Sequence, residues 1–375
     1  MENEMLKTHP AVFAVEDEYQ IMVCVKEPCL MWVQIGEEKI FDESNGMLRS
    51  NVTTHRMHVP GDLLNREKKY TLCWRKVIDR KPYFTQTEEE QRLEYSFRPV
   101  PEDKIIIYHV SDAHKMIDAP VTAARHFEKK YGKIDLLILN GDIPNHSGDI
   151  SQFDTVYEIV SALTGGEIPT IFSRGNHDMR GVHAETFAEY TPNRYGNTYY
   201  TVRIGSIAAI LLDCGEDKED SCEAYGHTIC CHQFRQRQTK WLRQIVDGKQ
   251  FEDPSIRYKL VISHNPFPLA LKQERFDIEQ DIYGEWCSIL KNEIQPDLLM
   301  VGHYHKQFVS FPGDERDDHL GNPCPVAVCC IPRRGDAEKG TVDYHAGAGF
   351  LFENGSITCC FADCNGVLSG EIVIK

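Results

Sequence analysis

The chain has no long apolar run, and this absence excludes one class of protein. Its 375 residues contain no stretch approaching the roughly 20 apolar residues that a helix needs to cross a bilayer. The first residues, Met1-Glu2-Asn3-Glu4, also lack the basic and apolar segments of a secretory signal. We therefore expect a soluble, cytoplasmic protein that has no membrane partner.

An excess of positive charge is absent as well. The formal net charge is −16, from 41 Lys and Arg against 57 Asp and Glu. Such an acidic chain is poorly suited to broad electrostatic attachment to nucleic acid or anionic lipid. Nucleic acid is therefore not an expected partner, and its cleavage is disfavoured as an activity because no basic stripe is visible.

Cysteine is plentiful, but its placement does not favour disulfides. The chain has 14 cysteines, which include the adjacent pairs Cys230-Cys231, Cys329-Cys330 and Cys359-Cys360. Adjacent cysteines are poorly placed to bridge each other, and no export signal is visible. Reduced thiols are therefore the simpler expectation.

Two regions of different pattern divide the chain. In residues 1–100, short β-rich stretches between polar turns predict an all-β sandwich. These stretches are 19–25, 30–35, 39–41, 52–59, 69–77 and 93–97. The segment 64–70 resembles the tyrosine corner of a fibronectin type III domain, with Tyr70 following Leu64 across a turn. Pro99 and Pro101 break any regular element, so a second domain is expected over 103–375.

The second region alternates strands with helices, as layered α/β domains do. The apolar spacing predicts helices over 120–131, 153–163, 238–246 and 278–293. After His305 only strands are expected, over 308–311, 325–331, 347–353, 356–361 and 367–374. We expect a second sheet there, packed on the first.

Five short polar clusters each follow an apolar run that predicts a strand. They are Asp112-Ala113-His114, Gly141-Asp142, Gly175-Asn176-His177-Asp178, Ser263-His264-Asn265 and Gly302-His303-Tyr304-His305. Open α/β folds place their sites beyond the carboxyl ends of strands, so we expect the clusters to gather at one edge of a sheet. This mixture of imidazole, carboxylate and amide groups favours Mn, Fe or Zn over Ca.

In this order the clusters resemble the motifs of calcineurin-like metallophosphoesterases: Asp-x-His, Gly-Asp, Gly-Asn-His-Asp/Glu, a lone His and Gly-His-x-His. The resemblance covers the chain from Lys104 onward. It implies a two-sheet α-β-β-α sandwich and two divalent transition-metal ions, and it implies the ligands of each. One ion would be held by Asp112, His114 and His305, the other by Asn176, His264 and His303, with Asp142 bridging the two.

Two further residues of the third cluster have expected catalytic roles. By the same resemblance, His177 faces the substrate phosphate and assists departure of the leaving oxygen. Asp178 is expected to orient the His177 imidazole and raise its pKa.

An all-β region ahead of such a domain is the arrangement of purple acid phosphatases, but two positions depart from that group. Asn145 stands where those enzymes need a tyrosinate ligand, and His114 stands where their first motif ends in glycine. No Fe(III)-tyrosinate colour is therefore expected.

The resulting hypothesis is a metal-dependent hydrolase of phosphoric esters, in which a hydroxide bridging both metals attacks phosphorus. The ligands do not distinguish a monoester from a diester substrate. The alternative is a non-catalytic scaffold that keeps the fold and binds a partner. All the ligands and His177 are present, which favours the enzyme.

Several residues near the clusters keep alternative interpretations. His146 and His183 could approach the phosphate, or be ordinary loop residues. Arg174 and Arg180 could bind the phosphate bidentately or pair with carboxylates, and pairing is the default for Arg174. A zinc site is conceivable at Cys222, His227, Cys230, Cys231 and His232, although a loop overhanging the site is preferred because the spacing fits no established tetrahedral pattern. Residues 332–336 are interpreted as a solvated turn.

Overall fold

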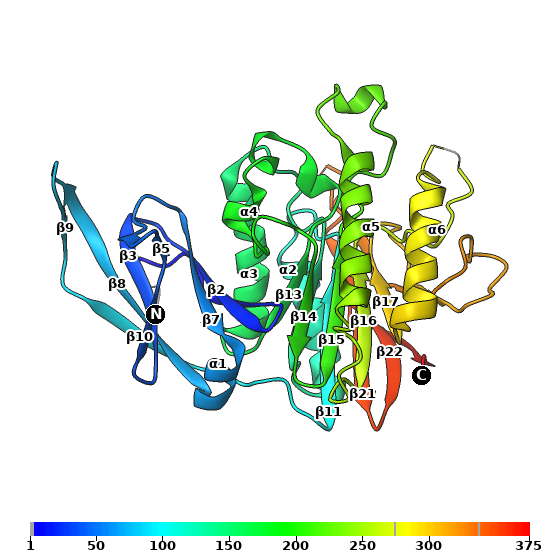
Figure 1. The fold of residues 1–375 in the computed structure, drawn as a ribbon, viewed down its shortest axis with the longest axis horizontal. Helices are drawn as coiled ribbons and strands as arrows, with labels where there is room; N and C mark the ends of the chain where they lie inside the picture. Colours follow the sequence, from blue (N-terminus) through cyan, green and yellow to red (C-terminus); the bar gives the residue numbers. More distant parts are fainter. Residues whose placement is uncertain (1–3, 274, 337) are drawn as a thin grey trace.

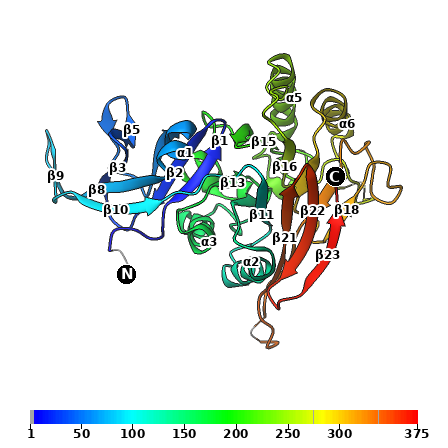
Figure 2. The ribbon, with the colours of Figure 1, turned by 90° about the horizontal axis from the view of Figure 1, so that it is seen from below.

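Two sheets packed face to face form the centre of the molecule in the computed structural model, which describes residues 4–273, 275–336 and 338–375. Figure 2 shows α2 (Asp118–Tyr131) and α3 (Asp154–Thr164) on one side of the sheets and α5 (Cys231–Asp247) and α6 (Gln280–Ile289) on the other. A single π turn, Leu290–Ile294, continues α6. The expected α-β-β-α sandwich is therefore confirmed.

The first sheet joins strands from both ends of the chain (Figure 1). Its order is β23 (Leu368–Val373), β22 (Ser356–Asp363), β21 (Tyr344–Glu353), β11 (Lys104–Val110), β12 (Leu136–Asn140), β13 (Thr170–Ser173), β1 (Ala11–Val15), β2 (Glu18–Cys24) and β7 (Thr54–Pro60), with β20 (Ile331–Arg333) beside β21. The strands β11, β12 and β13 are parallel, whereas β21 pairs antiparallel with β11.

The second sheet is built mainly from the middle of the chain. Its order is β14 (Tyr200–Ile204), β15 (Ile207–Leu212), β16 (Tyr258–Ser263), β17 (Leu298–Val301), β19 (Val326–Val328) and β18 (Phe308–Ser310). The sequence reasoning missed β14 and β15, although β15 is a continuous apolar run that is buried along its whole length.

The placement of the C-terminal strands corrects one expectation. The strands β21, β22 and β23 extend the first sheet, and only β18 and β19 belong to the second. Alternating apolar residues show that a strand has a buried face, but they do not show which strand it pairs with. Here Phe350 and Phe352 of β21 are buried in the core between the sheets, opposite Ile105 and Ile107 of β11.

Each layer of the sandwich has its own buried apolar contacts. Ile107 and Leu260 lie in the core between the two sheets. The next residue on β11, Tyr108, points the other way and its ring lies 5.3 Å from that of Phe127 on α2. Trp286 of α6 covers the outer face of the second sheet. Strand side chains alternate between the two faces, which is why adjacent residues serve different layers.

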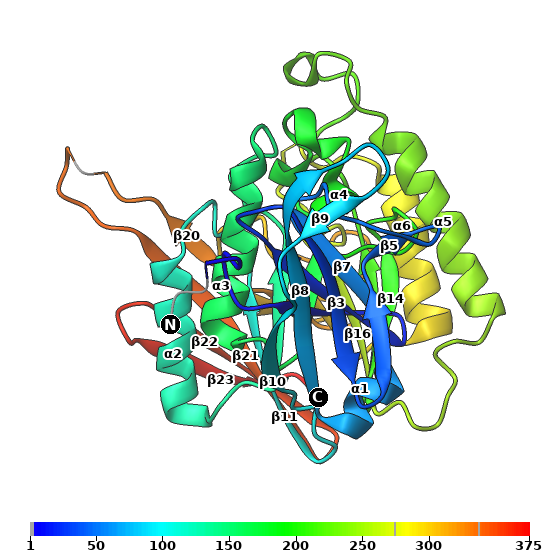
Figure 3. The ribbon, with the colours of Figure 1, turned by 90° about the vertical axis from the view of Figure 1, so that its left-hand side faces the viewer.

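The N-terminal region is hydrogen-bonded directly to the first sheet. Its strands β1, β2 and β7 continue that sheet, and β1 is parallel to β13 with Phe13 opposite Thr170. Its other sheet has the order β10 (Gln91–Ser96), β8 (Lys69–Arg80), β3 (Cys29–Ile35) and β4 (Glu38–Phe41), with β9 (Thr85–Thr87) beside β8. Figure 3 shows β8, β3 and β10 on the side of the molecule that faces the viewer. A small hairpin joins β5 (Glu43–Ser44) to β6 (Met47–Leu48). The domain boundary near residue 100 and the fibronectin type III likeness stay predictions.

Tyr70 does not form the expected tyrosine corner. A short helix, α1 (Gly61–Glu67), fills the turn before β8. The buried Tyr70 hydroxyl reaches across to the second region and donates to the carbonyl oxygen of Gly166 at 2.8 Å. This hydrogen bond ties the N-terminal region to the segment that precedes β13.

Two expectations from composition can be compared with the structure. All 14 cysteines are unpaired, as the sequence predicts. Among the described residues, no helix is both long and apolar enough to span a membrane.

Candidate metal centre

The five polar clusters meet at one end of the sandwich, but they come from two sheets. The first three clusters follow β11, β12 and β13 of the first sheet, and the last two follow β16 and β17 of the second. The expectation of a single sheet edge is therefore wrong. Because the two sheets pack face to face, the carboxyl ends of both sets of strands border the same space.

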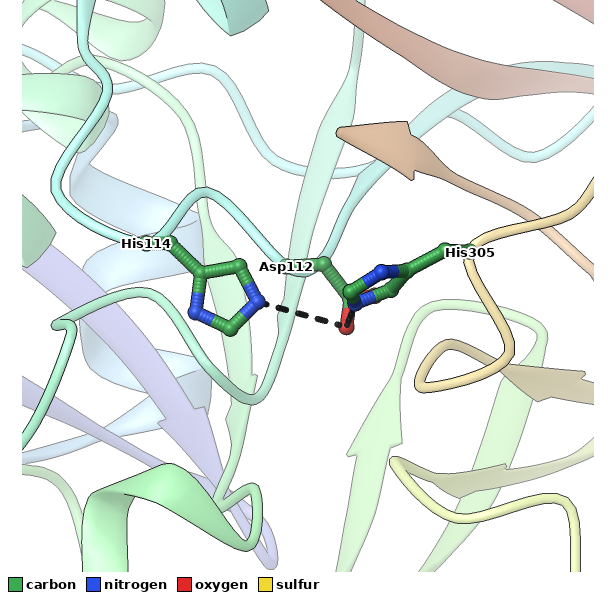
Figure 4. A group of neighbouring side chains, drawn as sticks. All are labelled: Asp112, His114 and His305. Atoms are coloured by element: carbon green, nitrogen blue, oxygen red, sulfur yellow. Dashed lines mark ion pairs between the residues drawn. The ribbon is translucent and has the colours of Figure 1, made fainter. Parts of the chain in front are cut away.

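Asp112, His114 and His305 form one group that could hold a metal ion. Figure 4 shows their side chains pointing toward one another, Asp112 and His114 from the loop after β11 and His305 from the loop after β17. The Asp112 Oδ1 atom lies 3.2 Å from His305 Nε2 and 4.0 Å from His114 Nε2.

Asp142, His264 and His303 form a second such group. The Asp142 Oδ2 atom lies 3.3 Å from His264 Nε2, and His264 Nε2 lies 3.8 Å from Asp112 Oδ1 of the first group. The buried Asn176 completes this side, because its Oδ1 lies 3.0 Å from His303 Nδ1. The structure thus brings all seven expected ligands together, while their division between two ions stays a prediction.

Buried polar atoms at this centre fit a bound cation. Within the described part of the chain, Asp112 Oδ1 and His264 Nε2 are buried and have no hydrogen-bond partner. Leaving such atoms unsatisfied is costly, so they usually have a partner. A divalent cation between the carboxylate and the imidazole would satisfy both, and the donor set suits Mn, Fe or Zn.

The backbone at the expected ligands adopts an uncommon conformation. Positive φ angles occur at Asp112 (54°), His114 (43°), Asp142 (53°), His303 (64°) and His305 (52°). Non-glycine residues seldom occupy this region, which costs of the order of 1–3 kcal/mol at each position. Five strained positions around one space indicate that the surrounding fold holds these side chains in place for function.

Two glycines let the loops approach one another. A Cβ atom at Gly175 would lie 2.2 Å from Asp142 Oδ1. One at Gly302 would lie 2.2 Å from Ser111 Oγ and 2.7 Å from Asp112 Oδ2. Both aspartates could hold their present positions only beside residues without a side chain.

The two central carboxylates are kept ionised. Burial opposes ionisation of Asp112, but His264 and His305 outweigh it and hold the pKa of this carboxyl well below its usual range. The same competition, with His264 as the main opposing neighbour, lowers the pKa of Asp142 to about 2. Charged carboxylates are the form that binds cations.

Asp178 does not orient His177, which corrects that expectation. Its Oδ2 accepts backbone hydrogen bonds from Gly175 at 2.7 Å and Asp142 at 3.2 Å. The His177 Nδ1 instead lies 3.1 Å from the carbonyl oxygen of Asn145. Asp178 is fully buried below the loops, so it fixes the backbone that carries Asp142 and does not contact the imidazole.

Asn140 is a site residue that the sequence reasoning missed. Its carbonyl oxygen lies 2.7 Å from His264 Nδ1, which directs Nε2 of that ring into the centre. Its side-chain amide donates to the carbonyl oxygens of Ser263 at 3.0 Å and Met300 at 3.2 Å, and so links the two sheets. A buried amide at the end of an apolar strand was the available signal.

The arginines beside the third cluster both pair with carboxylates. Arg174 Nε lies 2.7 Å from Asp213 Oδ2, which confirms the default for this residue. Arg180 binds both carboxylate oxygens of Glu216, at 2.8 and 2.9 Å. The sequence reasoning missed Glu216 because nothing around it marks a site.

Residues 332–336 are not simply a solvated turn. Residues Ile331–Arg333 form β20 and pair with β21. The next residue, Arg334, donates from its guanidinium to the carbonyl oxygen of His114. Arg334 therefore lies at the border of the candidate centre.

The remaining residues with alternative interpretations, such as His146 and His183, lie outside the groups of side chains that could hold a metal. His146 Nδ1 accepts a hydrogen bond from the Gly148 backbone, and His183 packs edge-on against Tyr190. Across the described residues, every group able to hold a metal lies at this centre. None of those groups includes Cys222, His227, Cys230, Cys231 or His232.

Known proteins with similar sequences are phosphoesterases by name. The chain is 25% identical over 186 residues to a probable cyclic nucleotide phosphodiesterase of Rhodopseudomonas palustris, a match covering 49% of this chain and 61% of that protein. It is 23% identical over 194 residues to the serine/threonine-protein phosphatase CPPED1 of Danio rerio, covering 49% and 58%. The matched part is thus less than two thirds of either relative's length.

The fold and the family are shown by two further matches. The solved structure of a purple acid phosphatase from yellow lupin (Lupinus luteus) seeds is similar, with a TM-score of 0.62 and 13% identity. That match covers 100% of this chain and 74% of the lupin protein, and at such low identity it shows the fold alone. The family model of calcineurin-like phosphoesterases matches residues 105–307, more than half of the chain. The protein therefore belongs to the calcineurin-like phosphoesterase family.

Proposed function

We propose that the protein hydrolyses phosphoric esters at a dinuclear metal centre. The observation that carries the proposal is the convergence of seven donor side chains on one space, where Asp112 Oδ1 and His264 Nε2 are buried without hydrogen bonds. The relatives, named as a phosphodiesterase and a phosphatase, support the same chemical class. Two divalent cations, when bound, would supply a bridging hydroxide as nucleophile and neutralise charge on the phosphate.

Each side chain of the centre has a proposed role in this reaction. Asp112, His114 and His305 would hold one cation, and Asn176, His264 and His303 would hold the other. Asp142 would serve both, because a carboxylate has two oxygens with which to bind cations. His177 borders the same space, with Nε2 at 3.9 Å from Asp142 Oδ2, and assists departure of the leaving alcohol.

Metal analysis combined with turnover tests this proposal. Purified protein loaded with Mn, Fe or Zn is expected to hold about two ions per chain and to hydrolyse 4-nitrophenyl phosphate or bis(4-nitrophenyl) phosphate. Chelation should abolish turnover, and added Mn should restore it. A protein that holds well under two ions and turns over neither substrate with any of these metals would be the scaffold alternative.

A further inference from the structure

Arg180 is clamped at the border of the candidate metal centre. Its Nε and Nη2 donate to Glu216 Oε1 and Oε2, at 2.8 and 2.9 Å. The Glu216 side chain is buried and also accepts a hydrogen bond from the Tyr225 hydroxyl at 3.1 Å. A bidentate pair of this kind fixes the plane of the guanidinium, so the direction of its third nitrogen is also fixed.

That third nitrogen faces the centre. Arg180 Nη1 lies 2.9 Å from His177 Nε2, which in turn lies 3.9 Å from Asp142 Oδ2. The other ring nitrogen, Nδ1, lies 3.1 Å from the carbonyl oxygen of Asn145, which only accepts, so Nδ1 donates there and Nε2 accepts one N–H of Arg180. When Nη1 donates to a phosphate oxygen instead, Nε2 is free to carry the proton with which His177 assists the leaving alcohol. Arg180 Nη1 therefore lies on the His177 side of the centre, and it carries a second N–H group besides the one that points to His177.

Arg174 shows what a purely structural arginine looks like in the same loop. Its side chain is 11% exposed, against 36% for Arg180. Its guanidinium pairs with Asp213 and packs over the rings of Phe187 and Phe234. Arg174 is enclosed by protein, whereas Arg180 keeps an exposed edge beside the centre.

The exposed side of the Arg180 guanidinium matches a difference between phosphoric monoesters and diesters. A monoester has three terminal phosphate oxygens and a second negative charge, whereas a diester has two terminal oxygens and one charge. Two cations can contact two of these oxygens. The third oxygen of a monoester needs a donor of its own, and guanidinium is the side-chain group best matched to phosphate.

We propose that Arg180, held in place by Glu216, binds the terminal oxygen that only a monoester carries, and so makes the site prefer phosphomonoesters. The inference rests on the proposed phosphoester hydrolysis at this centre. In it, Arg180 contacts substrate, and Glu216 is a positioning residue that acts through Arg180. The pKa of Arg180 is raised by Glu216, so its charge is present at any pH at which the protein works.

The test compares Arg180→Met with wild type on a monoester and a diester. The kcat/KM for 4-nitrophenyl phosphate should fall roughly 10- to 100-fold, as expected for loss of a charged hydrogen bond, while that for bis(4-nitrophenyl) phosphate changes less than about 3-fold. Calorimetry on metal-loaded protein should show a similar loss of affinity for inorganic phosphate, with dimethyl phosphate binding unchanged. Glu216→Gln should move both readouts in the same direction by a smaller factor, at an unchanged melting temperature.

Controls separate this effect from misfolding and from overall charge. Arg243→Met removes an arginine that pairs with Glu285 and Glu293 on the surface of α5, and should leave both kcat/KM values unchanged. The double variant Arg180→Met/Glu216→Gln avoids an unpaired buried carboxylate and should keep the same preference as Arg180→Met.

Two results would overturn the inference. In the first, kcat/KM for both esters falls by the same factor in the Arg180 variants. In the second, the affinity of these variants for inorganic phosphate stays at the wild-type value. If wild type hydrolyses neither ester, the proposed function fails. Phosphate binding would still report on Arg180 in that case.

Discussion

The floor and the rim of the candidate centre are built differently. The floor consists of the seven expected ligands, which follow the ends of five strands in two sheets: Asp112, His114, Asp142, Asn176, His264, His303 and His305. The rim consists of Arg180, Glu216 and Arg334, which lie in the connections after β13, β15 and β20. The floor is mostly buried and backbone-constrained, whereas Arg180 at the rim keeps an exposed edge.

This difference bears on how well each part tolerates substitution. Floor residues are held by strained backbone and by close contacts at Gly175 and Gly302, so few substitutions fit there. Rim residues contact the floor through single side chains, such as Arg180 with His177. We propose that the floor sets the type of reaction and that the rim sets the choice of ester.

Asp142→Asn should have the largest effect. Losing the bridging charge should remove several kcal/mol of transition-state stabilisation, or on the order of a thousandfold in kcat. Steady-state turnover and metal content by mass spectrometry check this together. Retention of near wild-type turnover with two bound ions would show that the floor is not the reaction centre.

Gly175→Ala tests how tightly the floor is packed. The new methyl group would press on Asp142 Oδ1 and on the Asp142 backbone nitrogen, which lie 2.2 and 2.4 Å from its ideal position. Because the new methyl group would displace the expected ligand Asp142, metal affinity and kcat should fall roughly 10- to 100-fold. The matched control is Gly284→Ala in α6, where nothing lies within 4 Å, and it should stabilise the protein by about 0.5–1 kcal/mol. Equal behaviour of the two variants would contradict the close packing.

Asp178→Ala tests the support beneath the floor. It should leave the backbone N–H groups of Gly175 and Asp142 without acceptors, at a cost of about 1–3 kcal/mol of unfolding free energy. Asp178→Asn keeps an acceptor oxygen and should cost much less. Denaturant unfolding of the two variants decides this, and equal losses would argue against a role as acceptor for these backbone groups.

Arg334→Met should have the smallest effect. It removes one hydrogen bond to the carbonyl oxygen of His114 and no expected ligand. Turnover should fall by no more than about 10-fold, because only part of the roughly 1.5–3 kcal/mol of such a charged hydrogen bond bears on the reaction when it holds the backbone of a single ligand. A loss as large as that of Asp142→Asn would break the distinction between rim and floor.

Local sequence patterns were sufficient for most of the fold. Apolar spacing predicted α2, α3, α5 and α6 within several residues, because a buried helical face needs a period near 3.6. The same reasoning missed β1, β14 and β15 and placed β21 to β23 in the wrong sheet. Strand pairing joins residues far apart in the chain, such as His109 with Ala348, and no local pattern specifies the partner.

The candidate centre divides in the same way. The floor could be predicted because five clusters of metal-ligating residue types follow predicted strands, and because their order resembles the motifs of calcineurin-like metallophosphoesterases, which imply the ligands. Tertiary packing was needed to show that the ligands come from two sheets, that Asp178 supports the backbone, and that Asn140 of β12 donates to β16 and β17 of the other sheet. It also placed Glu216 against Arg180. No local sequence pattern marks these side chains as partners. Their contacts form only when loops far apart in the chain pack together.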